Sequence, residues 1–555
     1  MTTILAGLLV YVALTIPSQF GRLTPGALVQ IPLEGLIIAA LLLLLPARVK
    51  RVVAALAGIV LGLLTILKLV DIGFNGALGR PFDLVLDWIL LDDAVGTLAR
   101  SIGQVGAVAA AVASLALAAA VLVLMALSVL RLSRLTARYK TTTTRTVAVF
   151  GVAWLACALL GVQVVPGVPV ASRSAAALAY GSARQARATL LDPQVFAAEI
   201  ARDAFRDTPG DHLLTALRGK DVIFTFVESY GRSAVSDPAL APIVDPVLDA
   251  GTRQLSAAGF ASRSAFLTSS TYGGGSWLAH ATLQSGLWTP TEQRYKYFVS
   301  SDRLTLSSAF RRANWRTVAV MPGTAGAWPE GALYRYDQIY AAQNLDYHGP
   351  KFTLGTMPDQ YTLSAFERLE HGTPNRGPVM AEIELTSSHA PWAPVPRPID
   401  WNDVGDGSVF GPMAADGDQP DSVWRDPARI RTAYARSIAY SLSTLISYVK
   451  TYGNDNLVLV FLGDHQPAVV TDTGASRDVP ITIVAKDPAV LDRISGWGWQ
   501  DGLKPGPQAP VWRMDSFRDR FLTAFGPQAE PAKPITAATQ HRMPCWRSTA
   551  ARAGL

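Results

Sequence analysis

The chain has 555 residues, of which half are apolar and only 17% are charged, and its mean hydropathy is +0.24. This length exceeds one domain, and the composition is typical of membrane segments joined to a soluble domain. Two cysteines, Cys157 and Cys545, exclude a disulfide framework and a cysteine-based zinc site. The net charge of +6 does not indicate a nucleic-acid partner, because the stretches 47–52 and 131–145 together hold eight basic residues and no acid. We interpret this basicity as a topology signal.

Five apolar runs are long enough to cross a bilayer, which needs about 20 residues. They lie near residues 4–20, 28–46, 52–70, 104–130 and 146–165. The first run lacks a basic n-region and a small-residue cleavage site, so we interpret it as an anchor. Both basic loops fall on one side if the N-terminus is cytoplasmic, and the odd number of spans then places everything after residue 165 outside the cell. We expect a multi-pass protein of the cell membrane.

The outward loop 71–103 is rich in aspartate, with apolar residues between the acids. It is either an interfacial amphipathic helix or an ordinary connecting helix, and the sequence leaves both open. We divide the chain into a transmembrane domain of five helices (1–165), a helical connector (166–218), a catalytic domain (219–504) and a Pro-rich C-terminal tail (505–555).

From residue 220 the pattern changes to short apolar runs that alternate with helical stretches. The expected strands are Asp221–Val227, Thr317–Met321, Val379–Leu385, Leu457–Leu462 and Val479–Ala485. Near-continuous apolar strands between helices indicate an α/β domain with a mostly parallel central sheet, covered by helices on both faces. In such sheets, ligands bind at the carboxyl ends of the strands.

Polar residues follow three of these strands. Glu228 ends the first, His389 follows another, and Asp464 and His465 end a third. Taken singly, each has a plainer interpretation as a solvated strand end, a helix cap or a loop hydrogen-bonding residue. Their coincidence at one rim favours a metal site, and carboxylate with imidazole ligands suits Mn²⁺ or Zn²⁺ better than Mg²⁺.

Gly273–Gly275 run into Ser276 and an apolar-periodic segment, which is typical of a tight turn that feeds a helix. Glycines let the backbone approach a ligand, and the amides of a helix N-terminus favour negative charge. A metal ion at this rim would lower the pKa of the Ser276 hydroxyl and make it a nucleophile. The plainer interpretation is a Gly-rich loop with a serine cap.

Four motifs make the chain resemble the sulfatase/alkaline-phosphatase superfamily, and more closely its lipoteichoic acid synthase-like branch of membrane phosphoglycerol and phosphoethanolamine transferases. The motifs are Val227-Glu228-Ser229, Gly463-Asp464-His465, Ser388-His389-Ala390-Pro391-Trp392, and Ser276 followed in register by Leu283, Ser285 and Gly286. The resemblance covers the whole architecture of spans, connector and extracytoplasmic sulfatase-like domain. It implies that Glu228, Asp464 and His465 hold the metal, that Ser276 is both nucleophile and ligand, and that His389 binds substrate.

The chain also departs from the family patterns. Sulfatases carry Pro and Ser after the nucleophile and then an arginine, where this chain has His280, and they use a cysteine or a serine with a fuller motif. Sulfate-ester hydrolysis is therefore disfavoured. The closer branch uses threonine as nucleophile, for which serine is chemically equivalent. His280 lies one helical turn from Ser276 on the same face, where it either contacts the transferred phosphate or is structural.

The resemblance also places a headgroup pocket. Lipoteichoic acid synthases carry a histidine after a central strand and a tryptophan seven residues further on, where this chain has Met321 and Trp328, and their arginine is replaced by Glu330. Trp328 is thus a candidate substrate-binding residue. Glu330 either meets a cationic headgroup such as ethanolamine or is exposed to solvent.

These observations predict an extracytoplasmic metal-dependent transferase. It would move glycerol phosphate or a similar headgroup from a membrane phospholipid to a cell-envelope glycan or polymer through a phospho-serine intermediate. One divalent metal is expected, with Mn²⁺ favoured and Zn²⁺ or Mg²⁺ as alternatives. The alternatives are a phosphodiesterase or sulfatase-like hydrolase with the same site, and an inactive scaffold for envelope assembly.

Overall fold

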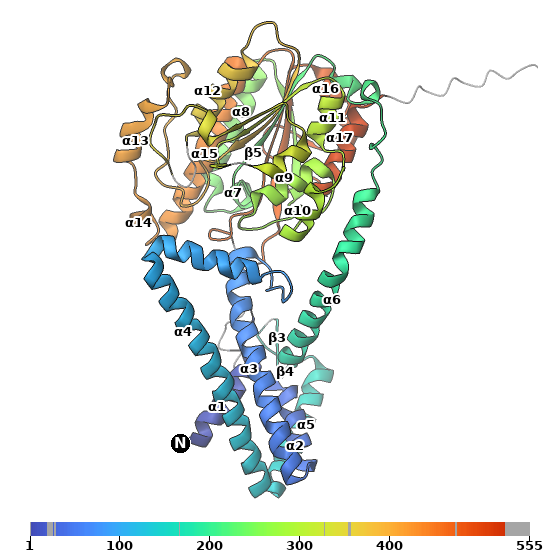
Figure 1. Ribbon diagram of the computed structural model, residues 1–555, viewed down its shortest axis with the longest axis vertical. Coiled ribbons are helices and arrows are strands. Elements are labelled where there is room, and N and C mark those ends of the chain that lie inside the picture. The colour runs from blue at the N-terminus through green and yellow to red at the C-terminus, as the bar shows by residue number, and fades with distance from the viewer. Residues whose placement is uncertain are drawn as a thin grey trace, which may run out of the picture.

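The computed structural model has a helical membrane half and a second half built on a sheet, which holds the expected catalytic residues and is called the catalytic half below (Figure 1). It describes residues 2–18, 26, 29–165, 167–326, 328–352, 357–471 and 474–527. In Figure 1 the membrane helices form the lower part of the molecule and the sheet lies in the upper part. A long helix on one side joins the two halves.

In its described residues, the membrane half contains five helices: α1 (Thr2–Thr15), α2 (Leu33–Leu44), α3 (Ala47–Leu78), α4 (Trp88–Arg138) and α5 (Lys140–Leu160). Within the described residues, three stretches are long and apolar enough to cross a membrane: Ala47–Gly76, Gly103–Arg138 and Lys140–Leu160. The predicted count of five spans is therefore not confirmed.

Prolines explain why α1 and α2 are only 14 and 12 residues long. A helix usually ends at or before the residue that precedes a proline. Accordingly, α1 ends two residues before Pro17, while Pro32 and Pro46 bound the apolar run that contains α2. The sequence prediction counted apolar residues across these breaks.

The loop 71–103, which we expect to face outward, is divided between two helices. α3 continues to Leu78 and is capped by Gly79 in the left-handed conformation (φ 60°). α4 begins at Trp88 and bends at Gly103, where φ is 81°. Figure 1 shows the part of α4 before this bend running below the catalytic half. The helix that we expect in this loop is present. It continues into the next apolar stretch, with a bend at Gly103.

The connector consists mainly of α6 (Ser174–Ala201), preceded by short strands. β1 (Ile31–Pro32) pairs in parallel with β4 (Ala171–Ser172), and β2 (Gln163–Val165) pairs with β3 (Val168–Pro169). With 28 residues, α6 is about 42 Å long at about 1.5 Å per residue. It spans the distance between the membrane helices and α10 (Glu292–Val299) in Figure 1.

The catalytic half contains a nine-stranded sheet in the described part of the chain, in the order β12-β6-β11-β10-β5-β9-β7-β8 with β13 beside β6. The strands are β5 (Asp221–Val227), β6 (Ala261–Thr268), β7 (Arg316–Met321), β8 (Gln338–Ala341), β9 (Val379–Leu385), β10 (Leu457–Gly463), β11 (Asp478–Ala485), β12 (Gln500–Asp501) and β13 (Val511–Arg513). All the strands expected from the sequence are present.

The sheet is mixed, whereas we predicted a mostly parallel one. The neighbours β10, β5, β9, β7 and β8 run parallel, but β11 runs antiparallel to both β10 and β6, and β12 is antiparallel to β6. β11 follows β10 without an intervening helix, so the chain reverses direction instead of crossing over. The pattern of a buried strand does not distinguish these two directions.

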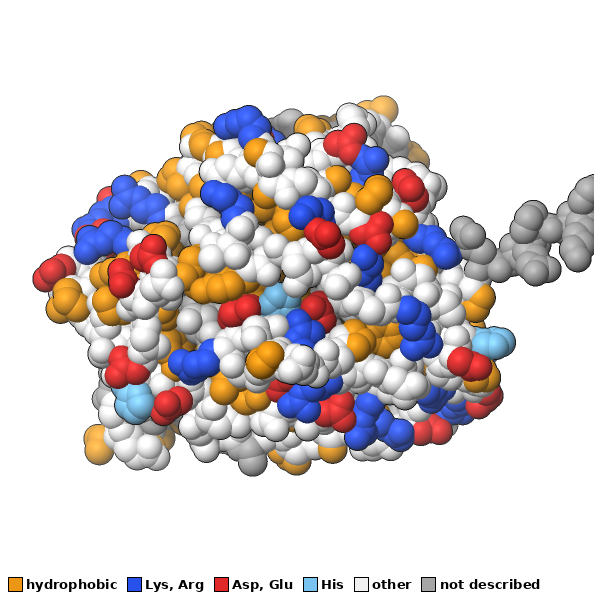
Figure 2. All heavy atoms as spheres, turned by 90° about the horizontal axis from the view of Figure 1, so that it is seen from above, with side chains coloured by type: hydrophobic (Ala, Val, Ile, Leu, Met, Phe, Trp, Pro, Cys, Tyr) orange, Lys and Arg blue, Asp and Glu red, His pale blue; other side chains and the backbone are white. Residues whose placement is uncertain are grey.

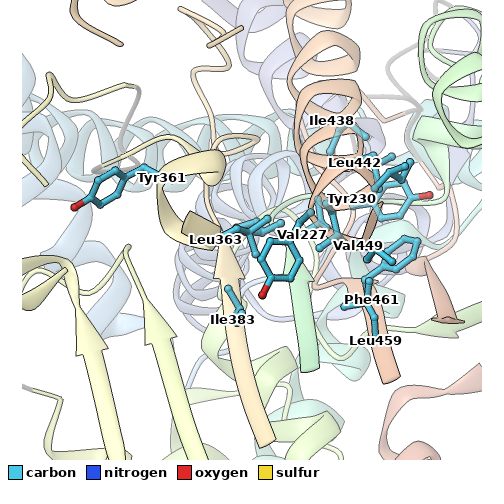
Figure 3. Close-up of a cluster of buried hydrophobic side chains, with 14 of the residues drawn as sticks. Val227, Tyr230, Tyr361, Leu363, Ile383, Ile438, Leu442, Val449, Leu459 and Phe461 are labelled. Carbon is cyan, nitrogen blue, oxygen red and sulfur yellow. The ribbon is translucent and has the colours of Figure 1, made fainter. Parts of the chain in front are cut away.

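Helices cover both faces of the sheet. They are α7 (Ser233–Ser236), α8 (Ala241–Ala257), α9 (Ser276–Ser285), α11 (Leu306–Arg312), α12 (Asp359–Phe366), α13 (Gly411–Asp416), α14 (Pro420–Val423), α15 (Pro427–Tyr452), α16 (Pro488–Asp492) and α17 (Phe517–Phe525). One hydrophobic cluster joins the sheet to α8, α12 and α15, and a second joins its other face to α9, α11 and α17. Figure 3 shows the first cluster, where Leu442 and Val449 of α15 lie against Phe461 of β10.

The face of the catalytic half that points away from the membrane helices is mixed in charge. In Figure 2, Lys and Arg side chains lie among Asp and Glu side chains over this face. A mixed surface of this kind gives no extended positive field for a polyanion.

A buried charge cluster ties the connector to the C-terminal helix of the catalytic half. Arg518 of α17 pairs with Asp203 at 2.8 Å, and both side chains are fully buried. Arg303 lies 3.4 Å from the same carboxylate. Removing one partner of a buried pair leaves an uncompensated charge, which is strongly destabilising.

We expect Asp203→Asn to lower the free energy of unfolding of the catalytic half by about 3–5 kcal/mol, because Arg303 and Arg518 lose the buried carboxylate that they share. Chemical denaturation of the full chain in detergent, followed by tryptophan fluorescence, measures this change. Asp207→Asn, at an exposed position in the same connector, is the control. Equal effects of the two substitutions would contradict the assignment.

Candidate active site

The centre of the site is a pair of carboxylates at the ends of two neighbouring parallel strands. β5 and β10 pair in register up to Val227 opposite Gly463. The next residues, Glu228 and Asp464, therefore lie side by side, and His465 follows directly. All three side chains are buried. The structure brings together the two strand ends that the sequence singled out.

Ser276 joins this group from the loop before α9. The three residues Gly273–Gly275 all have positive φ, which a side chain would disfavour, and α9 begins at Ser276. The Ser276 hydroxyl donates a hydrogen bond to Glu228 Oε2 at 2.8 Å and lies 3.4 Å from His465 Nε2. The serine oxygen is thus within contact distance of two of the three strand-end residues.

Backbone amides hold the carboxylates in place. The amides of Ser229 and His465 both donate to Asp464 Oδ1 at 2.7 Å, and the Ser229 hydroxyl donates to Glu228 Oε1 at 2.7 Å. Ser229 has a φ of 57°, an uncommon conformation for a residue with a side chain. These contacts fix one oxygen of each acid and leave the other directed toward Ser276 and His465.

The donor set fits a divalent cation. One ligand atom from each of Glu228, Asp464 and His465 lies within 4.8 Å of the others. Burial and the neighbouring charge of Glu228 raise the pKa of Asp464, because two adjacent carboxylates resist carrying two negative charges. A cation between them would remove this conflict, and two oxygens with an imidazole nitrogen suit several divalent metals.

His389 lies beside this group in the loop after β9. The hydroxyl of its neighbour Ser388 donates to the backbone carbonyl of Glu228 at 2.6 Å, which ties the loop to the end of β5. The Nδ1 of His389 bonds the carbonyl of Ala390 at 2.6 Å, so Nε2 is the nitrogen that a substrate can meet. His389 is only partly buried.

His280 lies one turn along α9 from Ser276 and does not reach the carboxylate pair. Its ring stacks on Phe226 with centroids 3.6 Å apart. Its Nδ1 bonds Glu382 Oε1 of β9 at 2.8 Å, and the other oxygen of Glu382 accepts from the Tyr336 hydroxyl at 2.6 Å. Within the described part of the chain, Nε2 of His280 makes no hydrogen bond. A carboxylate that accepts a hydrogen bond from Nδ1 fixes the orientation of the ring and keeps a proton on Nδ1.

Sequence reasoning missed Glu382 and Glu384, two acids within the buried strand β9. Glu384 pairs in register with Phe226, so it lies near Glu228 on the same face of the sheet, and it accepts from the Gly323 amide at 3.3 Å. Burial raises the pKa of Glu384, with His280 opposing and Glu228 adding to the effect. The signal was present, because an acid in an otherwise apolar strand needs a partner.

Trp328 lies apart from the carboxylate pair. It precedes the turn η5 (Pro329–Tyr334), packs on Tyr334 with centroids 5.4 Å apart, and its indole N–H reaches the Tyr295 hydroxyl at 3.5 Å. These aromatic residues pack against Leu278 of α9 in one hydrophobic cluster. Met321 is buried at the end of β7 and Glu330 is half-buried.

No family model and no curated protein matches the chain. Solved structures that resemble it include the lipoteichoic acid synthase LtaP from Listeria monocytogenes, with 15% identity and a TM-score of 0.38 over 58% of this chain and 75% of that one. The C-terminal periplasmic domain of EcEptC from Escherichia coli has 12% identity and a TM-score of 0.38, over 56% of this chain and 82% of that domain.

The Streptococcus pyogenes phosphoglycerol transferase GacH in complex with sn-glycerol-1-phosphate has 14% identity and a TM-score of 0.35, over 60% of this chain and 89% of that one. Lipoteichoic acid synthases and phosphoglycerol transferases are the proteins that the sequence motifs resemble. At these identities and TM-scores, the likeness does not bear on the activity of this chain.

We expect a divalent metal to stabilise the protein against heat. Saturation with Mn²⁺ at about 100 times its dissociation constant adds about 2.7 kcal/mol to the folded state. Thermal unfolding of the full chain with and without chelator measures the shift. Asp464→Asn should abolish it, whereas Glu330→Gln, which removes an acid outside the cluster, should keep it. A shift that survives Asp464→Asn would place the metal elsewhere.

We expect the Glu382–His280 bond to give a pH-dependent stability. Burial alone would lower the pKa of His280, but the bond to Glu382 and the charges of Glu382, Glu384 and Asp464 raise it above its usual 6.5. The stabilisation is therefore complete below pH 6.5 and declines as the pH rises through the raised pKa.

Glu382→Gln should accordingly lower the melting temperature most in acid and progressively less in alkali, by roughly 2–4 °C for each kcal/mol lost. Thermal unfolding of both proteins across the pH range checks this, with the exposed Asp492→Asn as control. A difference that is constant with pH would mean that His280 is neutral throughout.

Proposed function

We propose that the chain is a metal-dependent transferase that moves a phosphorus-containing headgroup from a membrane phospholipid to a hydroxyl of a cell-envelope glycan or polymer. The observation that carries the proposal is the hydrogen bond from Ser276 to Glu228 beside Asp464 and His465. A serine oxygen at a buried carboxylate and imidazole cluster is arranged for attack on a phosphoryl group. A membrane anchor would keep this group close to lipid headgroups.

In the first step, the Ser276 hydroxyl gives its proton to solvent and its oxygen attacks the phosphorus of the donor. Glu228 stays ionised, because burial alone would raise its pKa but the charges of His465 and His389 outweigh this effect and hold the pKa low. The bond from phosphorus to the diacylglycerol oxygen breaks, and His389 gives that oxygen a proton. The product is a phosphodiester on Ser276. A divalent ion held by Glu228, Asp464, His465 and the Ser276 oxygen would lower the pKa of the hydroxyl and neutralise phosphoryl charge.

In the second step, the hydroxyl of the acceptor attacks the same phosphorus and gives its proton to His389. The bond to the Ser276 oxygen breaks, and this oxygen recovers a proton from solvent. His389 therefore ends as it began. His280 of α9 is oriented by Glu382 and would contact a phosphoryl oxygen through Nε2, and Trp328 would border the headgroup from the aromatic cluster beside α9.

The finer parts of the proposal follow from the chemistry of the side chains. Mn²⁺ is favoured because two carboxylates and one imidazole suit it, with Zn²⁺ and Mg²⁺ as the other metals to test. We also infer a cytoplasmic N-terminus and an extracytoplasmic catalytic half. An odd number of spans gives this arrangement whether three or five segments cross, and both basic loops then face the cytoplasm.

Intact mass spectrometry tests the proposed intermediate. The full chain is incubated with Mn²⁺ and either phosphatidylglycerol or phosphatidylethanolamine. We expect a mass increase that maps to Ser276, whose size identifies the headgroup. Ser276→Ala should abolish the adduct, whereas Ser285→Ala, at a buried serine of the same helix, should retain it.

The result also separates the alternatives. An adduct that releases free alcohol phosphate in the presence of glycan acceptors would indicate a hydrolase. Bound metal without an adduct from either lipid would contradict the phospholipid donor, and the absence of both metal and adduct would favour the inactive scaffold.

A further inference from the structure

The loop that joins the first two long membrane helices, Gly79–Asp87, is internally rigid. Its residues Arg80 and Asp87 form a two-pronged ion pair at 2.5 and 2.6 Å, and the backbone amide of Asp83 donates to Asp87 at 2.7 Å. The amide of Phe82 donates to Asp71 of α3 at 2.9 Å. These contacts brace the loop at the end of α3, and we call Gly79–Asp87 the bracket.

This bracket contacts the loop that carries the nucleophile. The Arg477 guanidinium donates to the carbonyl of Gly79 at 3.3 Å and to the carbonyl of Ser270 at 3.2 Å, so it bridges the two loops. Gly79 lies so close to the ring of Tyr272 that a Cβ atom there would be 2.6 Å from it. Gly79 is therefore needed both for the positive φ that caps α3 and for this approach.

The bracket also holds the connector. The Asp83 carboxylate accepts from the Thr189 hydroxyl at 2.6 Å and from the Gln185 amide at 3.2 Å, both in the middle of α6. The same carboxylate accepts from two amides of its own loop. One short loop thus links three parts of the chain: the membrane helix α3, the connector α6 and the nucleophile loop.

The chain separations keep Ser276 close to the end of the first stretch that is long and apolar enough to cross a membrane. Tyr272 precedes Ser276 by four residues, which span at most roughly 14 Å of extended chain. Gly79 lies three residues past the last residue of the membrane-spanning stretch Ala47–Gly76. The polar layer of one leaflet is about 5–7 Å thick, so a headgroup needs to move only a short distance to meet the nucleophile.

We propose that the Gly79–Asp87 bracket holds the nucleophile loop toward the bilayer, so that the enzyme takes its lipid donor from the membrane in which it is anchored. This inference rests on the proposed function. Arg477 is a positioning residue in this arrangement, because it bonds two backbone carbonyls and does not contact the carboxylate pair. The donor reaches Ser276 within the plane of one membrane.

The test compares donors in the same membrane and in a separate one. The full chain is reconstituted in vesicles, and phospholipid with an isotopically labelled headgroup is placed either in those vesicles or in a second population. A third assay uses a short-chain donor below its micelle concentration. The readout is the rate at which the labelled adduct forms on Ser276. We expect the same-membrane rate to exceed the separate-membrane rate by about 10²-fold or more, because co-localisation sets the effective concentration.

Three variants examine the bracket. Arg477→Gln and Asp83→Asn should lower the same-membrane rate by about 10-fold or more, because a shift of about 1 Å at the reacting atoms can cost 10²-fold. Gly79→Ala serves as the third if either of these fails to fold. Arg218→Gln is the matched control, since Arg218 also donates to backbone carbonyls but at Gly210 and Leu213, away from the bracket.

Each outcome decides one point. No adduct in any format, including the short-chain donor, contradicts the proposed function. Equal rates from the two membranes overturn the inference while leaving the function in place. A strong preference for the same membrane that is unchanged in Arg477→Gln, Asp83→Asn and Gly79→Ala overturns the role of the bracket. Loss in these variants with retention in Arg218→Gln supports it.

Discussion

The catalytic half depends on the in-register pairing of β5 with β10. This pairing places Glu228 and Asp464 at adjacent positions, where burial and the charge of Glu228 raise the pKa of Asp464 and a shared cation would favour ionisation of both acids. It also requires Gly463, since a Cβ atom there would lie 1.9 Å from the carbonyl oxygen of Tyr230. The chain that follows β5 can pass this close to the end of β10 only because Gly463, the last residue of β10, has no side chain. Packing therefore requires the glycine of the Gly-Asp-His motif.

The part of the site that could be predicted from sequence is the part that depends on strand ends. Buried strands are visible as apolar runs, and polar residues directly after them lie at one rim whatever the connections between them. The Glu382–His280 bond could not be predicted in this way, because it joins a strand to a helix more than 100 positions earlier. The direction of β11 and the shortness of α1 and α2 were missed for a related reason. Apolar content alone records neither strand direction nor the breaks that prolines introduce.

The site combines two kinds of order. Around Asp464, backbone amides fix the acid, and backbone positions do not change when side chains move. Around His280, the order comes from side chains of α9, β9 and the residues before β8, which meet beneath the rim. The first arrangement suits a fixed ligand set. In the second arrangement, the charge of His280 depends on the side chains around it, close to where phosphoryl oxygens would lie.

The buried cluster of Asp203, Arg303 and Arg518 also determines where the catalytic half begins and ends as a folding unit. Its acid comes from the end of the connector, and one of its bases comes from α17, more than 300 positions later. A shortened protein that starts near residue 219 would keep two buried arginines without their acid, and one that stops near residue 504 would lose the helix that carries Arg518. A soluble version suited to crystallisation therefore has to reach from before Asp203 to the end of α17, so its limits are set by charge pairing and not by the edges of the sheet.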